Sequence, residues 1–202
     1  MGIKRLDEEK DHWSSDDVLK TVVIKRSMSR NRYLDIKKRI HFCDEDLSDK
    51  SDPIYKIRYL LNNTRDKAQQ LYQPSKQLSI DESLIAFKVR FIFIQYLSKK
   101  SSKFGIKFYV LAESKTGFMI NWICFSGKIE GNGSQTENIV NKLLECIPEQ
   151  TGHEIYCDNF YTSIPLAESL SERGFAMTGT IRQNRVGLPL EYKKRCFKIK
   201  QK

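Results

Sequence analysis

One stretch constrains the fold of this chain more than any other: a short apolar segment, Ile155-Tyr156-Cys157, that leads into Asp158 and then into a turn. These residue types suit a pleated, buried strand, whereas Asn159 and Thr162-Ser163 are turn and helix-capping types. The sequence therefore predicts a strand that ends at Asp158 and is followed by a helix. Because ligands and metal ions collect at the carboxyl ends of strands in open α/β sheets, Asp158 is a candidate site residue.

A second short segment, Leu78-Ser79-Ile80, leads into Asp81 in the same way. The chain between the two aspartates is long enough for a hairpin and a helix, which a return to the same sheet in parallel requires. If the two strands are neighbours, Asp81 and Asp158 face each other, and a hard divalent cation would relieve their repulsion. The alternative for Asp81 is a cap or turn residue. Glu82 is a weaker candidate, because it alternates to the opposite face of the strand.

Several longer strings occur in one order: SIDESLIAFK, QYLSKKSSKFGIKFYVLAESKTGFMINW, YCDNFYTSIPLAESLSERG and GTIRQNRVGLP. From about Ser29 to about Pro189 the chain resembles the transposase domain of the piggyBac family. The resemblance implies an RNase H-like fold in which three aspartates bind two divalent metal ions, Mg²⁺ or Mn²⁺, for DNA strand cleavage and transfer. Asp81 matches the first aspartate and Asp158 the second. The third is expected beyond Lys202, so we expect a truncated domain with impaired catalysis.

Basic residues are concentrated beside the candidate site. The formal net charge is +10, and the segment 84–112 holds six basic residues and no acidic one. Together with two arginines of the GTIRQNR string, these are the candidate DNA-binding residues: Lys88, Arg90, Lys99, Lys100, Lys103, Lys107, Arg182 and Arg185. The charge favours DNA as a partner through phosphate contacts. The alternative is a solvated basic surface that serves only solubility.

Five cysteines without any CxxC pair argue against a structural zinc site and against a disulfide framework. No apolar run approaches the roughly 20 residues of a membrane span, so we expect no membrane partner. We expect an intracellular protein that is located in the nucleus. The basic tail could act as a nuclear signal or a phosphate contact, and a solvated terminus is the alternative.

The order of the remaining patterns predicts an α/β fold, an RNase H-like mixed sheet preceded by a helical region, with both aspartate strands central. The expected parts are a flexible lead (1–26), a helical region (27–75), the partial transposase domain (76–189) and a basic tail (190–202). One helix is expected to begin at Ser29, and three further helices are expected to cover 54–71, 136–147 and 164–173. The expected strands cover 78–81, 91–97, 104–113, 118–125, 155–158 and 175–180.

Three functions fit these observations. The first is a transposase-derived DNA-binding protein without full catalysis. The second is a complete transposase activity in a homo-oligomer, or with a full-length transposase that supplies the missing carboxylate. The third is a protein-interaction module built on the transposase fold.

Overall fold

The computed structural model describes residues 4–44, 46, 48–86, 94–96, 104–127, 134–185 and 187–188. The chain separates into two compact units, Met1–Ser48 and Asp49–Lys202. This division lies inside the helical region 27–75 that the sequence outlined, because the helix after residue 54 packs on the sheet of the second unit. In the described part of the chain, no helix is long and apolar enough to cross a membrane.

The first unit consists of short helices around a small buried cluster. Its elements are a 3₁₀ helix η1 (Glu9–Trp13), α1 (Val22–Ser27) and α2 (Arg30–Arg39). Buried His12 contacts Thr21, with 2.8 Å between Nδ1 and Oγ1. The predicted start of α2 is confirmed, because the Ser29 side chain accepts a hydrogen bond from the Arg32 backbone N–H.

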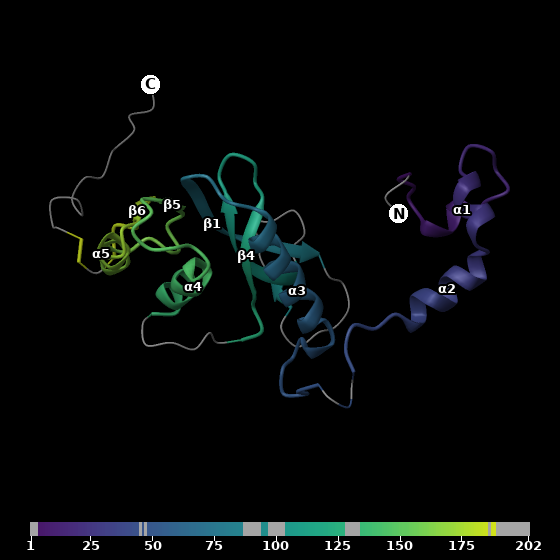
Figure 1. Cartoon of the computed structure of the whole chain (residues 1–202), viewed down its shortest axis with the longest axis horizontal. Coiled ribbons are helices and arrows are strands. Elements are labelled where there is room, and N and C mark those ends of the chain that lie inside the picture. The colour runs from purple at the N-terminus through teal and green to yellow at the C-terminus, as the bar shows by residue number, and fades with distance from the viewer. Residues whose placement is uncertain are drawn as a thin grey trace, which may run out of the picture. The chain divides into compact units, whose positions relative to one another are not determined.

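The second unit is built on one mixed sheet of six strands in the order β2-β3-β1-β5-β6, with β4 paired to β3 (Figure 1). The strands are β1 (Gln77–Ala86), β2 (Gln95–Tyr96), β3 (Phe104–Glu113), β4 (Met119–Cys124), β5 (Glu154–Cys157) and β6 (Ala176–Gly179). The helices are α3 (Tyr55–Leu71), α4 (Gln135–Leu144) and α5 (Ile164–Glu172). β1 pairs antiparallel with β3 and parallel with β5. The predicted parallel return to the same sheet is confirmed, and both aspartate strands are internal.

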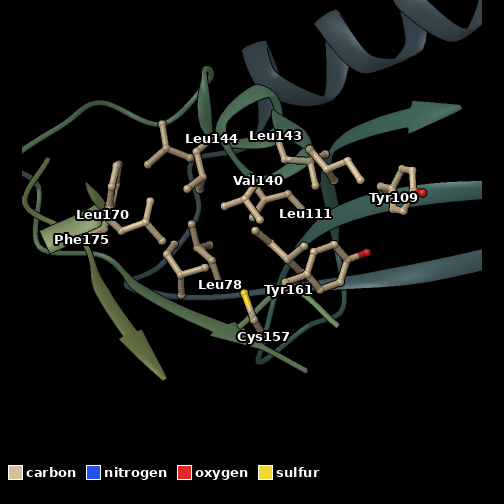
Figure 2. Close-up of a cluster of buried hydrophobic side chains, with 14 of the residues drawn as sticks. Leu78, Tyr109, Leu111, Val140, Leu143, Leu144, Cys157, Tyr161, Leu170 and Phe175 are labelled. Atoms are coloured by element: carbon tan, nitrogen blue, oxygen red, sulfur yellow. The ribbon is translucent and has the colours of Figure 1, made fainter. Parts of the chain in front are cut away.

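Helices cover the two faces of this sheet, as strand alternation requires. Figure 1 shows α3 along β4 and α5 beside β6. On one face, Ile54, Ile57 and Leu61 pack against Phe108 and Val110 of β3. The other face carries the larger core, to which α4 and α5 contribute (Figure 2). Its fully buried aliphatic members are Leu78, Leu111, Ile139, Val140, Leu143, Leu144, Ile155 and Leu170.

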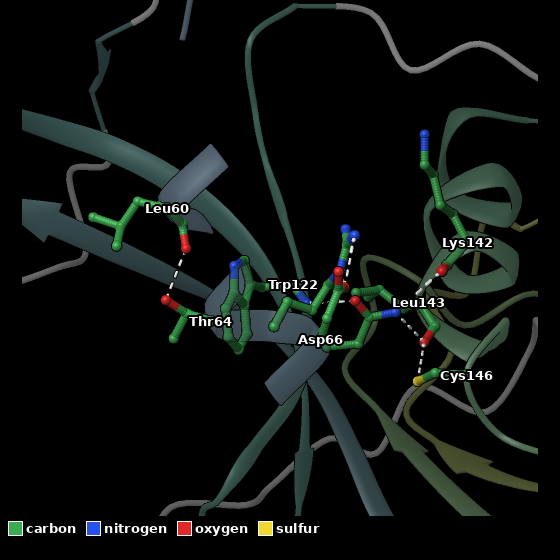
Figure 3. A network of polar contacts seen from close by, with 9 residues as sticks. Leu60, Thr64, Asp66, Trp122, Lys142, Leu143 and Cys146 are labelled. Atoms are coloured by element: carbon green, nitrogen blue, oxygen red, sulfur yellow. Dashed lines mark hydrogen bonds and ion pairs between the residues drawn. The ribbon is translucent and has the colours of Figure 1, made fainter. Parts of the chain in front are cut away.

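Helix α4 is held at both ends by polar side chains. At its start, Ser134 and Glu137 form a capping box, in which each side chain bonds the backbone of the other residue. At its end, buried Asn121 of β4 donates to the carbonyl oxygens of Lys142 (3.3 Å) and Leu143 (2.8 Å) in the network of Figure 3. Carbonyls at a helix end lack intrahelical partners, so Asn121 fixes α4 on the sheet.

Most element predictions hold with small differences at the ends, but β1 continues past Asp81 to Ala86, because residues 82–86 pair with β3, where the sequence predicted an end at Asp81. The hairpin of β3 and β4 is antiparallel, and Gly117 in its turn has φ 72°, a conformation that favours glycine. Helix α4 ends at Leu144 rather than Ile147, because a tighter turn with an Ile147 N–H to Leu144 oxygen bond precedes Pro148. The strand predicted at 91–97 lies mostly outside the described residues, which include only β2 there.

Candidate active site

The register of β1 and β5 places the two predicted aspartates together. Ile80 is paired with Cys157, and both side chains are buried in the core. Asp81 and Asp158 each follow that pair by one residue, so alternation turns both toward the opposite face. Both aspartates are exposed. The structure thus brings the two residues to one edge of the same face, as the sequence predicts.

Each aspartate is oriented by a backbone N–H close to it in the chain. The Glu82 N–H donates to Asp81 Oδ1 at 2.7 Å, and the Phe160 N–H donates to Asp158 Oδ1 at 2.8 Å. The Thr162 hydroxyl donates to the Asp158 carbonyl oxygen at 2.7 Å, which closes the turn before α5. Among the described residues, none donates a hydrogen bond to Oδ2 of either aspartate. One oxygen of each exposed carboxylate is therefore held by the backbone.

The donor set suits one hard divalent cation. Two carboxylates are typical of a Mg²⁺ site in which waters and substrate phosphates complete the coordination. No cluster of three or more His, Cys, Asp or Glu side chains occurs within the described ranges. Cys157 adds no ligand, because its thiol points into the core and burial raises its pKa to about 12, with Asp158 adding to the shift. The residues present fit a cation held by Asp81 and Asp158.

An ion pair joins β1 and β3 on the core side of the sheet. Lys107 Nζ is 3.2 Å from Glu82 Oε1, and only 11% and 17% of the two side chains are exposed. The ammonium also lies 4.5 Å from the centre of the Tyr109 ring and 5.2 Å from that of Phe160. The structure places Glu82 opposite Tyr109, on the face away from Asp81, as alternation predicts. Lys107, a candidate DNA-binding residue, thus contacts protein groups in this structure, and phosphate contact by it stays a prediction.

Tyr161 belongs to the turn that follows Asp158, and its ring lies in the core near Cys157 (Figure 2). Its side chain is fully buried and meets the rings of Phe160 and Tyr109 edge to face. Its hydroxyl has no hydrogen-bond partner within the described part of the chain. Burial raises the pKa of this hydroxyl, and the nearby charges of Glu82, Asp81 and Asp158 raise it further. Tyr161 therefore stays neutral and serves as an apolar support.

Two candidate DNA-binding arginines contact the turn that follows Asp158. Arg182 Nε and Nη2 both donate to Asn159 Oδ1 at 3.1 Å. Arg185 Nη2 donates to the carbonyl oxygens of Asn159 (3.1 Å) and Phe160 (2.5 Å). The structure thus brings these two basic groups to the turn that follows Asp158, and phosphate contact by them stays a prediction. Five further candidates lie outside the described residues: Lys88, Arg90, Lys99, Lys100 and Lys103.

Sequence reasoning did not identify the supports of the site, Lys107 with Glu82 and the rings of Phe160 and Tyr161. One signal was present: alternation puts Glu82 on a core face, where a carboxylate needs a partner. The pairing of β1 with β3 decides which cation becomes that partner. Residues near Glu82 in the sequence give no information about this pairing.

Comparisons with known proteins agree with this geometry. The family model described as Transposase IS4 matches residues 1–202. Human PiggyBac transposable element-derived protein 3 is 25% identical over 190 residues, which cover 89% of this chain and 31% of the relative. The human Chimeric ERCC6-PGBD3 protein is also 25% identical over 190 residues, which cover 89% of this chain and 17% of that protein.

A solved structure adds the fold. The piggyBac transposase in a synaptic complex with hairpin DNA is similar with a TM-score of 0.78 and 29% sequence identity, over 92% of this chain and 41% of that chain. The present chain thus spans less than half the length of each of these proteins. The resemblance and the RNase H-like fold class are both confirmed. The chain belongs to the transposase IS4 family as a piggyBac-type member.

Proposed function

We propose that this chain is a DNA-binding transposase domain whose strand chemistry depends on a divalent metal ion held by Asp81 and Asp158. The observation that supports the proposal is the parallel β1–β5 register, which pairs Ile80 with Cys157, the residues directly before the two aspartates. A bound Mg²⁺ or Mn²⁺ would activate a water or a DNA 3′-hydroxyl and stabilise the leaving oxygen.

The chain's own residues have separate tasks in this proposal. Backbone N–H groups fix one oxygen of each aspartate, so the remaining oxygens keep one direction toward a cation. Because these oxygens are already oriented, less conformational entropy would be lost when a metal ion and a phosphate bind. Tyr161 and the core behind it exclude water from the other side of the sheet.

DNA binding is supported by charge and by the structural relative. The chain has a formal net charge of +10, and the similar piggyBac transposase structure is a synaptic complex with hairpin DNA. We propose phosphate contacts from the exposed candidate Arg182 and from the basic candidates at 88–103. Arg185 is half-buried, with its Nη2 bonded to the turn and its Nε buried, so we propose that it supports this turn more than it contacts phosphate.

Catalysis by this chain alone is proposed to be impaired. The family chemistry that the resemblance implies uses three aspartates, and the described residues bring two together. A homo-oligomer or a full-length transposase would then supply the third carboxylate. The nucleus is the proposed location, since DNA is the proposed partner.

The decisive experiment is incubation of a supercoiled plasmid with the purified chain and Mn²⁺, alongside Asp158→Ala. We expect slow nicking that disappears in the variant, because one of two metal ligands is lost. The matched control is Glu168→Ala, which removes an exposed acid from α5 and should nick like the parent chain. Equal nicking by Asp158→Ala would show a contaminating nuclease and refute the metal site.

Plasmid binding is measured in the same samples between 50 and 200 mM salt. With about four phosphate contacts, the affinity should fall roughly 100-fold over this range. Salt-sensitive binding without nicking would indicate a transposase domain that has kept DNA binding alone. Binding that is absent or insensitive to salt would favour the protein-interaction module.

A further inference from the structure

Lys107 is largely buried, unlike a lysine that contacts DNA from an exposed surface. It lies on β3 opposite Leu84 of β1, and its ammonium reaches diagonally to Glu82. The side chain is 11% exposed and its charge is balanced by Glu82 at 3.2 Å. The rings of Tyr109 and Phe160 also lie within cation–π distance of the ammonium, at 4.5 and 5.2 Å. Little of this charge remains for a phosphate.

Two of the three residues around the Lys107 ammonium, Glu82 and Phe160, also orient the aspartates. Glu82 follows Asp81 and donates its backbone N–H to Asp81 Oδ1 at 2.7 Å. Phe160 follows Asp158 by two residues and donates its backbone N–H to Asp158 Oδ1 at 2.8 Å. One ammonium therefore contacts a residue beside each metal-ligand candidate, on two segments that are far apart in sequence.

We propose that Lys107 is a positioning residue, which sets the spacing of Asp81 and Asp158 by tying Glu82 and Phe160 together on the core side of the sheet. The inference rests on the proposed metal site, and it replaces phosphate contact as the role of Lys107. Lys107 acts through its neighbours and touches neither the metal nor the DNA. Groups that orient metal ligands in this way typically change metal affinity by about 10- to 100-fold.

The test uses the double variant Lys107→Met/Glu82→Gln of the full chain. Replacing both partners removes this ion pair without leaving Lys107 or Glu82 charged, and the net charge is unchanged, so long-range attraction of DNA is preserved. The matched control is Lys115→Met/Glu168→Gln, which makes the same two changes at exposed positions. Mn²⁺ affinity is measured by titration calorimetry, and exchange of the Glu82 and Phe160 amide protons by NMR without metal.

We expect the double variant to bind Mn²⁺ about tenfold more weakly than the parent chain and the control, and its Phe160 amide to exchange faster. Wild-type Mn²⁺ affinity together with an unchanged exchange rate would overturn the proposal. If the parent chain itself binds no Mn²⁺, the metal site of the proposed function fails. In that case the amide exchange still decides whether Lys107 holds the Asp158 turn.

A second variant tests the contact between the Lys107 ammonium and the Phe160 ring by changing Phe160. Phe160→Leu removes the ring that lies over the ammonium but keeps an apolar side chain and the backbone N–H. It should weaken Mn²⁺ binding in the same direction, even if the double variant fails to fold. Parent-like Mn²⁺ affinity and amide exchange in a folded Phe160→Leu protein would equally overturn the proposal.

Discussion

At the scale of single residues, Glu113 at the end of β3 links three segments. Its carboxylate accepts hydrogen bonds from Thr116 Oγ1 (2.5 Å), Tyr72 Oη (2.5 Å) and the Ser75 N–H (2.8 Å). These donors, Thr116 foremost, lower its pKa from 4.5 to about 2. Because the folded state binds this proton less tightly than the unfolded chain, the carboxylate stabilises the fold fully above pH 4.5. That stabilisation is lost as the pH falls toward 2.

Urea unfolding at several pH values tests this. The Glu113→Gln protein should be less stable than the parent at about pH 7, and the difference should shrink steadily between pH 4.5 and 2. The control Glu145→Gln changes an exposed acid of the same charge and should follow the parent. A difference between Glu113→Gln and the parent that stays constant down to pH 2 would contradict the role of the hydrogen bonds.

At the scale of elements, α4 depends on its capping box as well as on its buried face. The Ser134 hydroxyl accepts the Glu137 N–H, which otherwise has no partner in the first turn. Ser134→Ala should lower the free energy of unfolding by about 1 kcal/mol, whereas Ser134→Gly should cost only a few tenths. Unfolding followed by circular dichroism distinguishes the two. An alanine variant as stable as the parent chain would show that the cap contributes nothing.

At the scale of the whole molecule, the chain divides into two compact units, Met1–Ser48 and Asp49–Lys202. Each contains one tryptophan, Trp13 in the first and Trp122 in the second. Leu143→Ala removes a fully buried side chain from the core of the second unit and should cost about 2–5 kcal/mol. In a Trp13→Phe background, the fluorescence of Trp122 should report this loss.

In a Trp122→Phe background, the fluorescence of Trp13 should show an unchanged transition in the Leu143→Ala protein. The comparison is made within each background, so the cost of the reporter substitution cancels. Equal shifts of both reporters would mean that the chain unfolds as one cooperative body.

Local residue patterns were sufficient for most of the elements. Ser29 and Ser163 cap the helices that follow them, and Gly117 occupies the left-handed position of the β3–β4 turn. Each of these features involves residues only a few positions apart, so both partners of the interaction can be identified from a short stretch of sequence. Helix ends were less certain, since α4 stops at Leu144 because of a tight turn.

The sequence by itself determined that Asp81 and Asp158 each end a buried stretch and turn to the face opposite Ile80 and Cys157, because alternation in a strand is local. Only the tertiary structure decided that these strands are parallel neighbours in register, and that Lys107 meets Glu82 from 25 residues away. The physical reason is that strand pairing joins backbone groups that are distant in the chain. The partner of a buried charge is therefore set by the neighbouring strand, and not by the residues beside it in the sequence.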